Sequence, residues 1–264
     1  MSKHIKIFDT LEQQDAYEIL PCVSILSNGT NLKYHHKKVY KFAGLKIAPG
    51  PLYYNGSSYE IKDSWNYDSY DSVYGKNSGS YYFNFLEMGE LFEKSGFSTS
   101  DGSIENTLNP LNNWRLPTQT EWDSIVGTTR TGSTVNGNTA HCALIQLTGV
   151  THAGSSIPNG LLIFPDGETI IGKSLNGIDN ITQTTGVTLV ELNVYLNQGC
   201  IFLPASGYYD NGDWYDGGSG ALYWSSTEIN TNDAYDLYFD DGYISTDDFC
   251  NESGDYFTVR LVQE

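Results

Sequence analysis

The segment NNWRLPTQTEWDSIVG, residues 112–127, contains the strongest local structural signal in the chain. A proline stands directly before Thr118, and Glu121 follows three residues later. A threonine and a glutamate at this spacing form a capping box, in which the side chains satisfy free backbone N–H groups at the start of a helix. The pattern therefore predicts a helix near 118–126 that ends at Gly127.

Two more segments predict helices. TLVELNVYLNQGC begins with a second capping box, at Thr188 and Glu191, and predicts a helix near 188–198. Apolar residues at helical spacing predict another helix near 83–95. The side chains expected to face the core from these three helices are Trp122, Val126, Leu192, Tyr195, Leu196, Phe85, Met88 and Phe92.

Apolar runs between the helices indicate buried strands. LLIFPDG, residues 161–167, reaches a tight turn, and CIFLPASGYY, residues 200–209, follows the second capping box. The chain also contains 27 glycines, which favours many turns and short strands. Helices mixed with short strands in this way predict an α+β fold.

Charge is distributed unevenly along the 264 residues, whose formal net charge is −18. Residues 1–46 hold seven lysines against four acids, a net of +3. Residues 205–264 hold thirteen acids against Arg260 alone, a net of −12. Because affinity for nucleic acids comes largely from Lys and Arg, we expect no nucleic acid among the partners.

The charge change suggests a small N-terminal module before one large domain, since this length is near the upper limit for a single core. We expect residues 1–46 to form a β-hairpin/helix module and residues 47–264 to form the large domain. The elements expected in the module are a strand at 4–8, a helix at 10–20, and strands at 22–26 and 31–35 joined by a turn at Asn28 and Gly29.

The sequence carries no signal for export, membrane insertion or metal binding. It starts without an apolar stretch of signal-peptide length, and no run approaches the ~20 apolar residues of a membrane span. The four cysteines, Cys22, Cys142, Cys200 and Cys250, lack paired spacing and are expected to be reduced. We therefore expect no metal and no cofactor.

Six motifs occur in order along the second half of the chain: WRLPTQTEW, GLLIFPDG, GCIFLPASGYY, YWSSTE, AYDLYF and FTVRLV. Together they resemble the Fibrobacter succinogenes major paralogous domain family, which is abundant in gut Bacteroidetes and their phages. That family is similar to C-type lectin-like proteins and to formylglycine-generating enzymes. The resemblance covers roughly Asn113 to Val262 and implies a C-type lectin-like domain over residues 47–264.

The end of the chain also resembles the variable proteins of diversity-generating retroelements. In those proteins adenine-directed mutagenesis rewrites a C-terminal segment, typically at AAC codons, which never become codons for Lys, Gln, Glu, Met or Trp. Residues 229–251 contain none of these five amino acids and no Arg. The resemblance implies a variable region at about 205–262 that binds a protein or glycan on a cell surface.

The N-terminal module resembles the start of structural proteins from Bacteroides phages. This resemblance implies that residues 1–46 attach the protein to a virion or tail assembly. It places the protein in the phage particle, or in the cytoplasm before assembly. It leaves an oligomer open, such as a trimer in a fibre.

Alternation along the C-terminal strands separates scaffold from surface. Tyr235, Leu237, Phe239, Ile244, Phe257 and Val259 are expected to point inward. The outward residues are rich in Tyr, Asn, Ser and Asp, a composition typical of binding loops. The ligand-binding surface is expected to consist of Tyr209, Asn211, Asp213, Tyr215, Asp216, Ile229, Asn230, Asn232, Asp233, Asp236, Tyr238, Asp240, Asp241, Tyr243, Ser245, Asp247, Phe249, Asn251 and Tyr256.

Three other interpretations remain open. The surface could be solvated without a ligand, since exposed Tyr and Asp are common. An oxidoreductase like the formylglycine-generating enzymes would need reactive thiolates, and Cys250 is the only cysteine in the last sixty residues. A Ca²⁺-dependent sugar-binding lectin would use acids such as those of YYDNGDWYDGG, but their spacing fits no EF-hand. We expect no catalytic residue, and structural contacts from Arg115 and Arg260.

Overall fold

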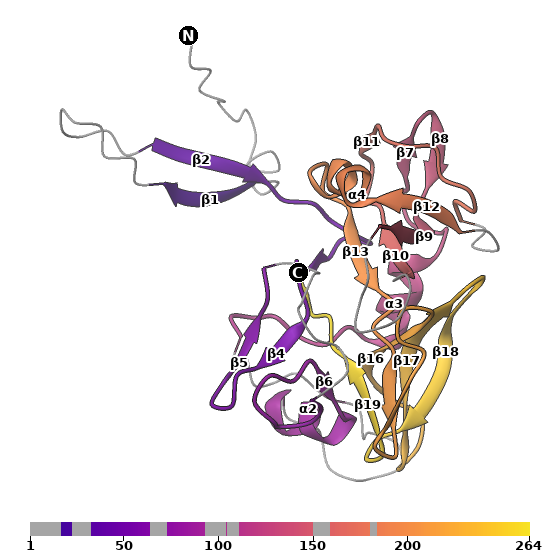
Figure 1. The fold of residues 1–264 in the computed structure, drawn as a ribbon. Coiled ribbons are helices and arrows are strands. Elements are labelled where there is room, and N and C mark those ends of the chain that lie inside the picture. The colour runs from indigo at the N-terminus through magenta and orange to yellow at the C-terminus, as the bar shows by residue number, and fades with distance from the viewer. Residues whose placement is uncertain are drawn as a thin grey trace. The chain divides into compact units, whose positions relative to one another are not determined.

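The computed structural model describes residues 17–22, 33–63, 73–92, 104, 111–149, 159–179 and 184–264. The chain divides into two compact units, Met1–Lys41 and Phe42–Glu264, which Figure 1 draws and which we describe separately. The expected border after residue 46 falls within the second unit, because Lys46 pairs with Gln263 there.

In the first unit, strands β1 (Tyr17–Cys22) and β2 (Lys33–Lys38) form an antiparallel pair in which Cys22 lies opposite Lys33. The sequence predicts a hairpin here, with strands at 22–26 and 31–35. Both strands are therefore displaced away from the connecting segment.

The helix expected at 10–20 is wrong at its C-terminal end. Residues 17–20 belong to β1, because their backbone pairs with β2 instead of closing helical turns. The strand expected at 4–8, the start of that helix and the turn at Asn28 and Gly29 lie outside the described residues.

The second unit is mixed α+β, as the sequence predicts. Its described helices are α2 (Phe85–Phe92), α3 (Gln119–Val126) and α4 (Leu189–Leu196). One four-stranded sheet has the order β12 (Thr185–Thr188), β9 (Cys142–Thr148), β10 (Asn159–Ile163) and β13 (Ile201–Pro204). A seven-stranded sheet has the order β15 (Asp213–Tyr215), β14 (Tyr208–Asp210), β19 (Asp255–Thr258), β16 (Ala221–Glu228), β17 (Asp233–Asp240) and β18 (Tyr243–Asn251), with β6 (Tyr82–Phe83) also paired to β19.

Smaller sheets complete this unit. They consist of β11 (Thr169–Ile170), β7 (Ser133–Val135) and β8 (Asn138–Ala140); of β20 (Val262–Gln263) and β3 (Lys46–Ile47); and of β4 (Leu52–Tyr54) and β5 (Tyr59–Ile61). Among the described pairings, β12 with β9, β11 with β7 and β16 with β19 are parallel. The other strand pairs are antiparallel, so the described part of the chain is not a parallel doubly wound sheet.

Both predicted capping boxes are confirmed. The Thr118 hydroxyl accepts from the Glu121 N–H, and the Glu121 carboxylate accepts from the Thr118 N–H at 2.8 Å. Thr188 and Glu191 make the same reciprocal contacts at the start of α4. Arg115 adds two 2.7 Å bonds to Glu121. Burial would raise the pKa of Glu121, but these bonds outweigh it and lower the pKa.

The buried faces of the helices match the expectation except at Val126 and Leu196, which are only partly buried. Phe85, Met88 and Phe92 of α2 are fully buried, as are Leu192 and Tyr195 of α4. In α3 the core residues are Trp122 and Ile125, whereas Val126 is only partly buried. Trp122 and Ile125, three residues apart, both lie on the side of α3 that packs against the sheet, whereas Val126, four residues after Trp122, lies at the edge of that side.

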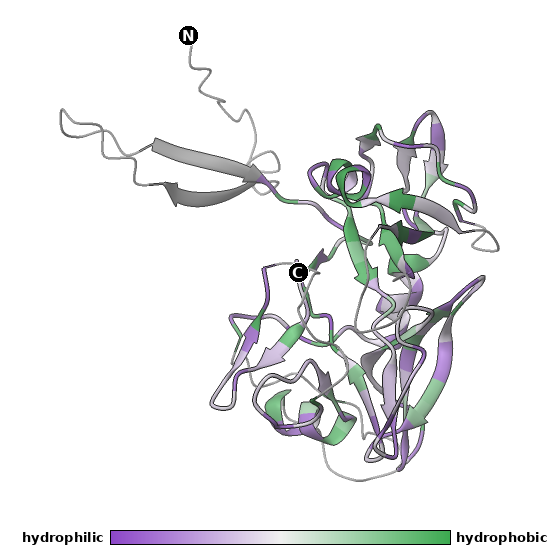
Figure 2. Ribbon diagram, in the orientation of Figure 1, coloured by the Kyte–Doolittle hydropathy of each residue, from purple (hydrophilic) through white to green (hydrophobic). Residues whose placement is uncertain are grey.

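The four-stranded sheet has an apolar core on both faces. All five residues of β10 are buried, and Leu162 packs with Phe164, Phe202 and Tyr195 in one cluster. In Figure 2 strands β10 and β13 are largely green, whereas β18 includes purple stretches. The run at 161–167 therefore predicts buried β10 correctly. The run at 200–209, expected as one buried strand, divides into buried β13 and into β14 of the seven-stranded sheet, because the chain leaves the first sheet after Pro204.

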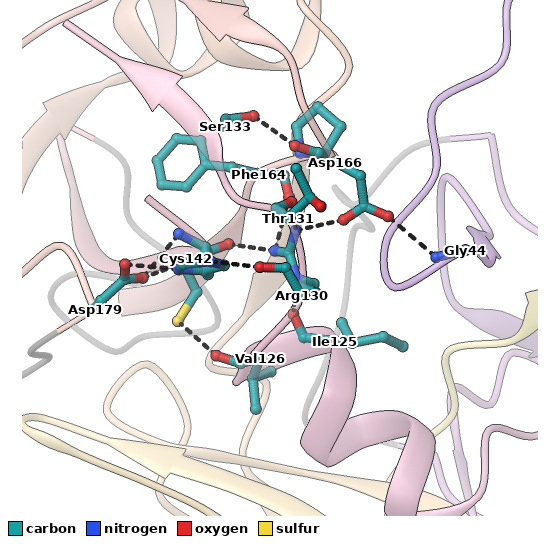
Figure 3. A network of polar contacts seen from close by, with 12 residues as sticks. Gly44, Ile125, Val126, Arg130, Thr131, Ser133, Cys142, Phe164, Asp166 and Asp179 are labelled. Atoms are coloured by element: carbon teal, nitrogen blue, oxygen red, sulfur yellow. Dashed lines mark hydrogen bonds and ion pairs between the residues drawn. The ribbon is translucent and has the colours of Figure 1, made fainter. Parts of the chain in front are cut away.

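One arginine that the sequence does not single out ties several segments together. The guanidinium of Arg130 donates to the carbonyl oxygens of His141 and Phe164, at 2.7 and 2.8 Å, and pairs with Asp166 at 2.8 Å (Figure 3). Asp166 in turn accepts from the N–H of Gly44 at 3.1 Å. The buried side chain of Arg130 therefore links the loop after α3 to the residue before β9 and to the end of β10. Through Asp166 it also links this loop to the start of the unit.

Candidate recognition surface

The residues expected to bind a ligand lie on the seven-stranded sheet and its turns. Eleven are exposed: Asn211, Asp213, Tyr215, Asp216, Ile229, Asn232, Asp241, Tyr243, Asp247, Phe249 and Asn251. Asn230, Asp233, Tyr238, Asp240, Ser245 and Tyr256 are partly buried. Asp236 and Tyr209 are buried, at 1% and 4% exposed.

The outward placement of Asp236 is wrong because β17 is covered on both faces. Helix α3 packs against β16, β17 and β18, while Ala234 belongs to the core cluster that surrounds α2. Asp236 and its neighbour Leu237 are therefore both buried. Alternation of apolar and polar residues identifies a solvent-exposed face only where one side of a strand meets water.

The outward placement of Tyr209 is wrong because its ring joins an aromatic cluster. Its centroid lies 4.5 Å from that of Tyr74 and 5.2 Å from that of Tyr82. In β14 the partly exposed tyrosine is instead its neighbour Tyr208.

The expected inward set is confirmed in four of six positions. Leu237, Phe239, Phe257 and Val259 are fully buried, whereas Tyr235 and Ile244 are only partly buried. β18 is the edge strand of the sheet, so Ile244 lacks a further strand beside it.

A β-bulge in β18 changes which expected residues share a face. Asp236 lies opposite Asp248, but Tyr238 lies opposite Ser245, so two steps in β17 correspond to three in β18. As a result Tyr243, opposite Asp240, and Phe249, opposite Tyr235, point to opposite faces of the sheet. Regular alternation would place Tyr243 and Phe249 on one face, and that expectation is wrong.

Four tyrosines and two aspartates gather on one face, which we call the tyrosine face: Tyr208, Tyr215, Tyr238, Tyr243, Asp216 and Asp240. Tyr208 and Tyr215 lie opposite each other across the β14–β15 hairpin, with ring centroids 5.7 Å apart. Tyr238 and Tyr243 are 5.9 Å apart across β17 and β18. Tyr215 and Tyr243 are the most exposed of the four, at 43% and 54%.

The sequence contains the signal that identifies Tyr208. Asn211 and Gly212 both have positive φ, 50° and 93°, so they form the two-residue turn that an Asn-Gly pair favours. Counting back from such a turn pairs Tyr208 with Tyr215. Applying the hairpin rule to YYDNGDWY would therefore have selected Tyr208 instead of Tyr209.

Buried carboxyl groups lie in the same sheet. Burial, and then the neighbouring charge of Asp248, raise the pKa of Asp236 well above its ordinary value. Neither Asp236 oxygen has a hydrogen-bond partner with good geometry. A weak contact from the Cys250 thiol opposes the rise in the Asp236 pKa. Burial, followed by Asp210 on the paired strand, raises the pKa of Asp255 to about 6.

Burial keeps the thiols of the three cysteines in the second unit protonated, because it raises their pKa values. Burial raises the pKa of Cys142 to about 12, and it also raises the pKa values of Cys200 and Cys250. In Cys250 the charges of Asp236 and Asp255 add to this effect. These environments are the opposite of those that produce a reactive thiolate.

Within the described residues, no three or more His, Cys, Asp or Glu side chains are arranged to hold a metal ion. Asp210 and Asp213 lie opposite each other across the β14–β15 hairpin, next to its Asn-Gly turn. No helix in the described part of the chain is both long and apolar enough to cross a membrane.

Residues 191–262 match the model of a family described as a domain of unknown function (DUF8237). The match begins in α4 and covers the strands that carry the tyrosine face. Neither curated proteins nor solved structures gave a match.

Proposed function

We propose that the second unit is a ligand-binding module that recognises a protein or glycan on a cell surface. The observation that carries the proposal is the tyrosine face, where exposed Tyr215 on β15 and Tyr243 on β18 belong to a sheet with a fully buried core. Tyrosine gives a large contact area with few rotatable bonds, which makes it an effective anchor in binding surfaces.

The support for this face is rigid. Trp224 stacks on Phe257 with centroids 4.0 Å apart, and its indole donates to the Phe83 carbonyl at 2.8 Å. Leu237 and Phe239 are fully buried in the strand that carries Tyr238. Substitution of the exposed side chains of this sheet therefore leaves intact the buried contacts that hold the strands together.

The same division suits a surface that varies. We propose a C-type lectin-like fold and a retroelement-diversified C-terminal region, in a protein of a phage or prophage. The resemblance of the six motifs supports the fold, and the composition of residues 229–251 supports diversification. In this proposal the first unit attaches the module to a virion or tail assembly.

The two other functions have less support. An oxidoreductase related to formylglycine-generating enzymes needs reactive thiolates, whereas burial raises the pKa values of Cys142, Cys200 and Cys250. A Ca²⁺-dependent lectin needs several oxygen ligands around one ion, and no described group of acids has that arrangement.

A binding experiment tests the recognition function. The intact chain is screened against a glycan array and against gut bacterial cells, beside a variant in which Asp213, Tyr215 and Tyr243 are all serine. We expect the variant to lose capture while its unfolding midpoint stays close to that of the parent, because all three side chains are exposed. Capture that survives in the variant would place the binding site elsewhere.

Sequencing tests the diversification. The coding DNA and its flanks should contain a reverse transcriptase gene and a near-copy of the C-terminal coding segment that differs at adenines. Differences between isolates should fall on the exposed positions and spare buried ones such as Leu237 and Phe239. Differences spread equally over both classes would contradict the proposal.

A further inference from the structure

Two carboxylates on the tyrosine face flank a residue that has no side chain. A methyl group built on buried Gly220 would lie 3.1 Å from the carbonyl oxygen of Phe239, 3.5 Å from the Cβ of Asp240 and 3.6 Å from the Cβ of Asp216. Asp216 comes from the turn after β15, and Asp240 ends β17. The fold therefore brings two acids, 24 residues apart in sequence, close to the same glycine.

Aromatic rings surround this acid pair. The Tyr238 hydroxyl donates to Oδ2 of Asp240 at 2.9 Å, which leaves Oδ1 available. Burial, then Asp240, and then Asp216 and Tyr208 raise the pKa of Tyr238, so groups from both tyrosine pairs act on this ring. Tyr243 packs against Tyr238 and is 54% exposed, which leaves ring surface open to a partner.

The chain provides no cation for these acids within its described residues. Neither Asp216 nor Asp240 takes part in an ion pair there. Arg260 is the only Lys or Arg among residues 205–264, and it is fully buried, donating to the carbonyl oxygens of Ala48 and Phe202. The face is therefore negative and aromatic, and its complement is a positive charge on a partner.

We infer that the tyrosine face binds an arginine side chain of a partner protein, with the guanidinium between Asp216 and Asp240. This inference rests on the proposed recognition function and specifies the chemistry of the ligand. A guanidinium offers five donors in a plane, so it bonds carboxylates on two sides while it stacks on tyrosine rings. A lysine ammonium is a compact, strongly hydrated charge that lacks this planar fit.

The test uses the full chain and labelled peptides of a Gly-Arg repeat, with Gly-Lys and Gly-citrulline repeats as matched probes. Citrulline has the shape of arginine without its charge. Fluorescence anisotropy should give an affinity for the arginine peptide about tenfold or more above that for the citrulline peptide, and several-fold above that for the lysine peptide. Equal affinity for the arginine and lysine peptides, or for the arginine and citrulline peptides, overturns the inference.

Paired variants separate this site from the general attraction of an acidic protein. Asp216→Asn with Asp240→Asn should weaken arginine-peptide binding about tenfold, because both carboxylates are lost. Asp63→Asn with Glu264→Gln removes the same charge from exposed positions outside the face and should change affinity by less than about twofold. Asparagine tolerates the positive φ of 55° at Asp216, so the first pair preserves the turn.

Each outcome is decisive. Equal weakening in both pairs would show attraction by net charge alone and overturn the inference. If the arginine peptide shows no preference while the serine variant at Asp213, Tyr215 and Tyr243 still loses cell or glycan capture, the recognition function stands and the arginine assignment falls. If that variant keeps its capture, the recognition function itself is wrong.

Discussion

Strands β10 and β17 lie inside two different sheets of the same unit, and they bury different chemistry. Every residue of β10 is buried, and apart from Asn159 and Gly160 at its start they are apolar. β17 buries Ala234, Asp236, Leu237 and Phe239, so a carboxyl group lies among its core residues. The first strand has no exposed residue to offer a partner, whereas the second supports the tyrosine face.

The comparison shows how strand patterns translate into structure. An apolar run such as 161–165 predicts burial whatever the register, because both faces of the strand are covered by other side chains. For a strand in which apolar and polar residues alternate, the prediction is correct only if the right set of alternate residues is assigned to the buried face. One extra residue in a neighbouring strand reverses that assignment.

The largest expected effect is on the apolar sheet. Leu162→Ala should lower the free energy of unfolding by about 2–5 kcal/mol, because the side chain is fully buried among Phe164 and Phe202. Denaturant titration measures the change. Val190→Ala, at a position 75% exposed in α4, is the matched control and should stay within about 0.5 kcal/mol. Equal losses in the two variants would contradict the assigned burial.

The next prediction concerns Asp236, the acid buried in β17. Burial and Asp248 raise its pKa in the folded state, so the folded protein keeps a proton that the unfolded chain releases. This carboxyl therefore lowers stability progressively as pH rises from its ordinary pKa toward the raised folded value. Asp236→Asn carries no such charge, so its stability relative to the parent should increase from pH 4 to pH 8.

The measurement is the free energy of unfolding of both proteins across this pH range. Asp255, whose pKa is raised to about 6, adds a decline in stability between about pH 4 and pH 6 and also acts on Asp236, so the difference between the two proteins is read from pH 6 to pH 8. Asp247→Asn is the control, because this carboxyl is exposed. A pH-independent difference for Asp236→Asn would show that the carboxyl is solvated.

Local signals in the sequence predict much of the scaffold. The spacing of Thr118 and Glu121 locates the start of α3, and the mixed α+β class follows from elements that form largely from nearby residues. What the sequence misses depends on tertiary contacts. Asp236 is buried because α3 and the α2 cluster cover both faces of its strand, and Arg130 acquires its role only when β9 and β10 meet the loop after α3.

The candidate site is predictable only in part. Tyr215, Asp216 and Tyr243 are exposed as expected, since hairpin ends reach solvent in most registers. The division of Tyr243 and Phe249 between two faces depends on the bulge in β18, for which the sequence offers no local signal comparable to an Asn-Gly turn.

A smaller effect is expected at the helix caps that accompany the two sheets. Thr118→Ala and Thr188→Ala should each cost about 1 kcal/mol, because each removes the hydroxyl that accepts from a backbone N–H. Thr120→Ala is the matched control, since it changes an exposed threonine within α3 and leaves the cap intact. Thermal or denaturant unfolding measures all three, and a control as costly as the cap variants would assign the loss to something other than capping.

The smallest expected effect tests the bulge itself through a pair of double-mutant cycles. Tyr238 and Tyr243 are in ring contact on one face, so removing both should reveal a coupling energy of about 0.5 kcal/mol or more. Tyr243 and Phe249 belong to the same strand but point to opposite faces, so Tyr243→Ala and Phe249→Ala should add within about 0.3 kcal/mol. Each cycle is measured by denaturant unfolding at fixed pH. A strand without the bulge would place Tyr243 and Phe249 on the same face as Tyr235. Tyr243 would then lose its coupling to Tyr238, and that result would show that β18 pairs with β17 in regular alternation, without a bulge.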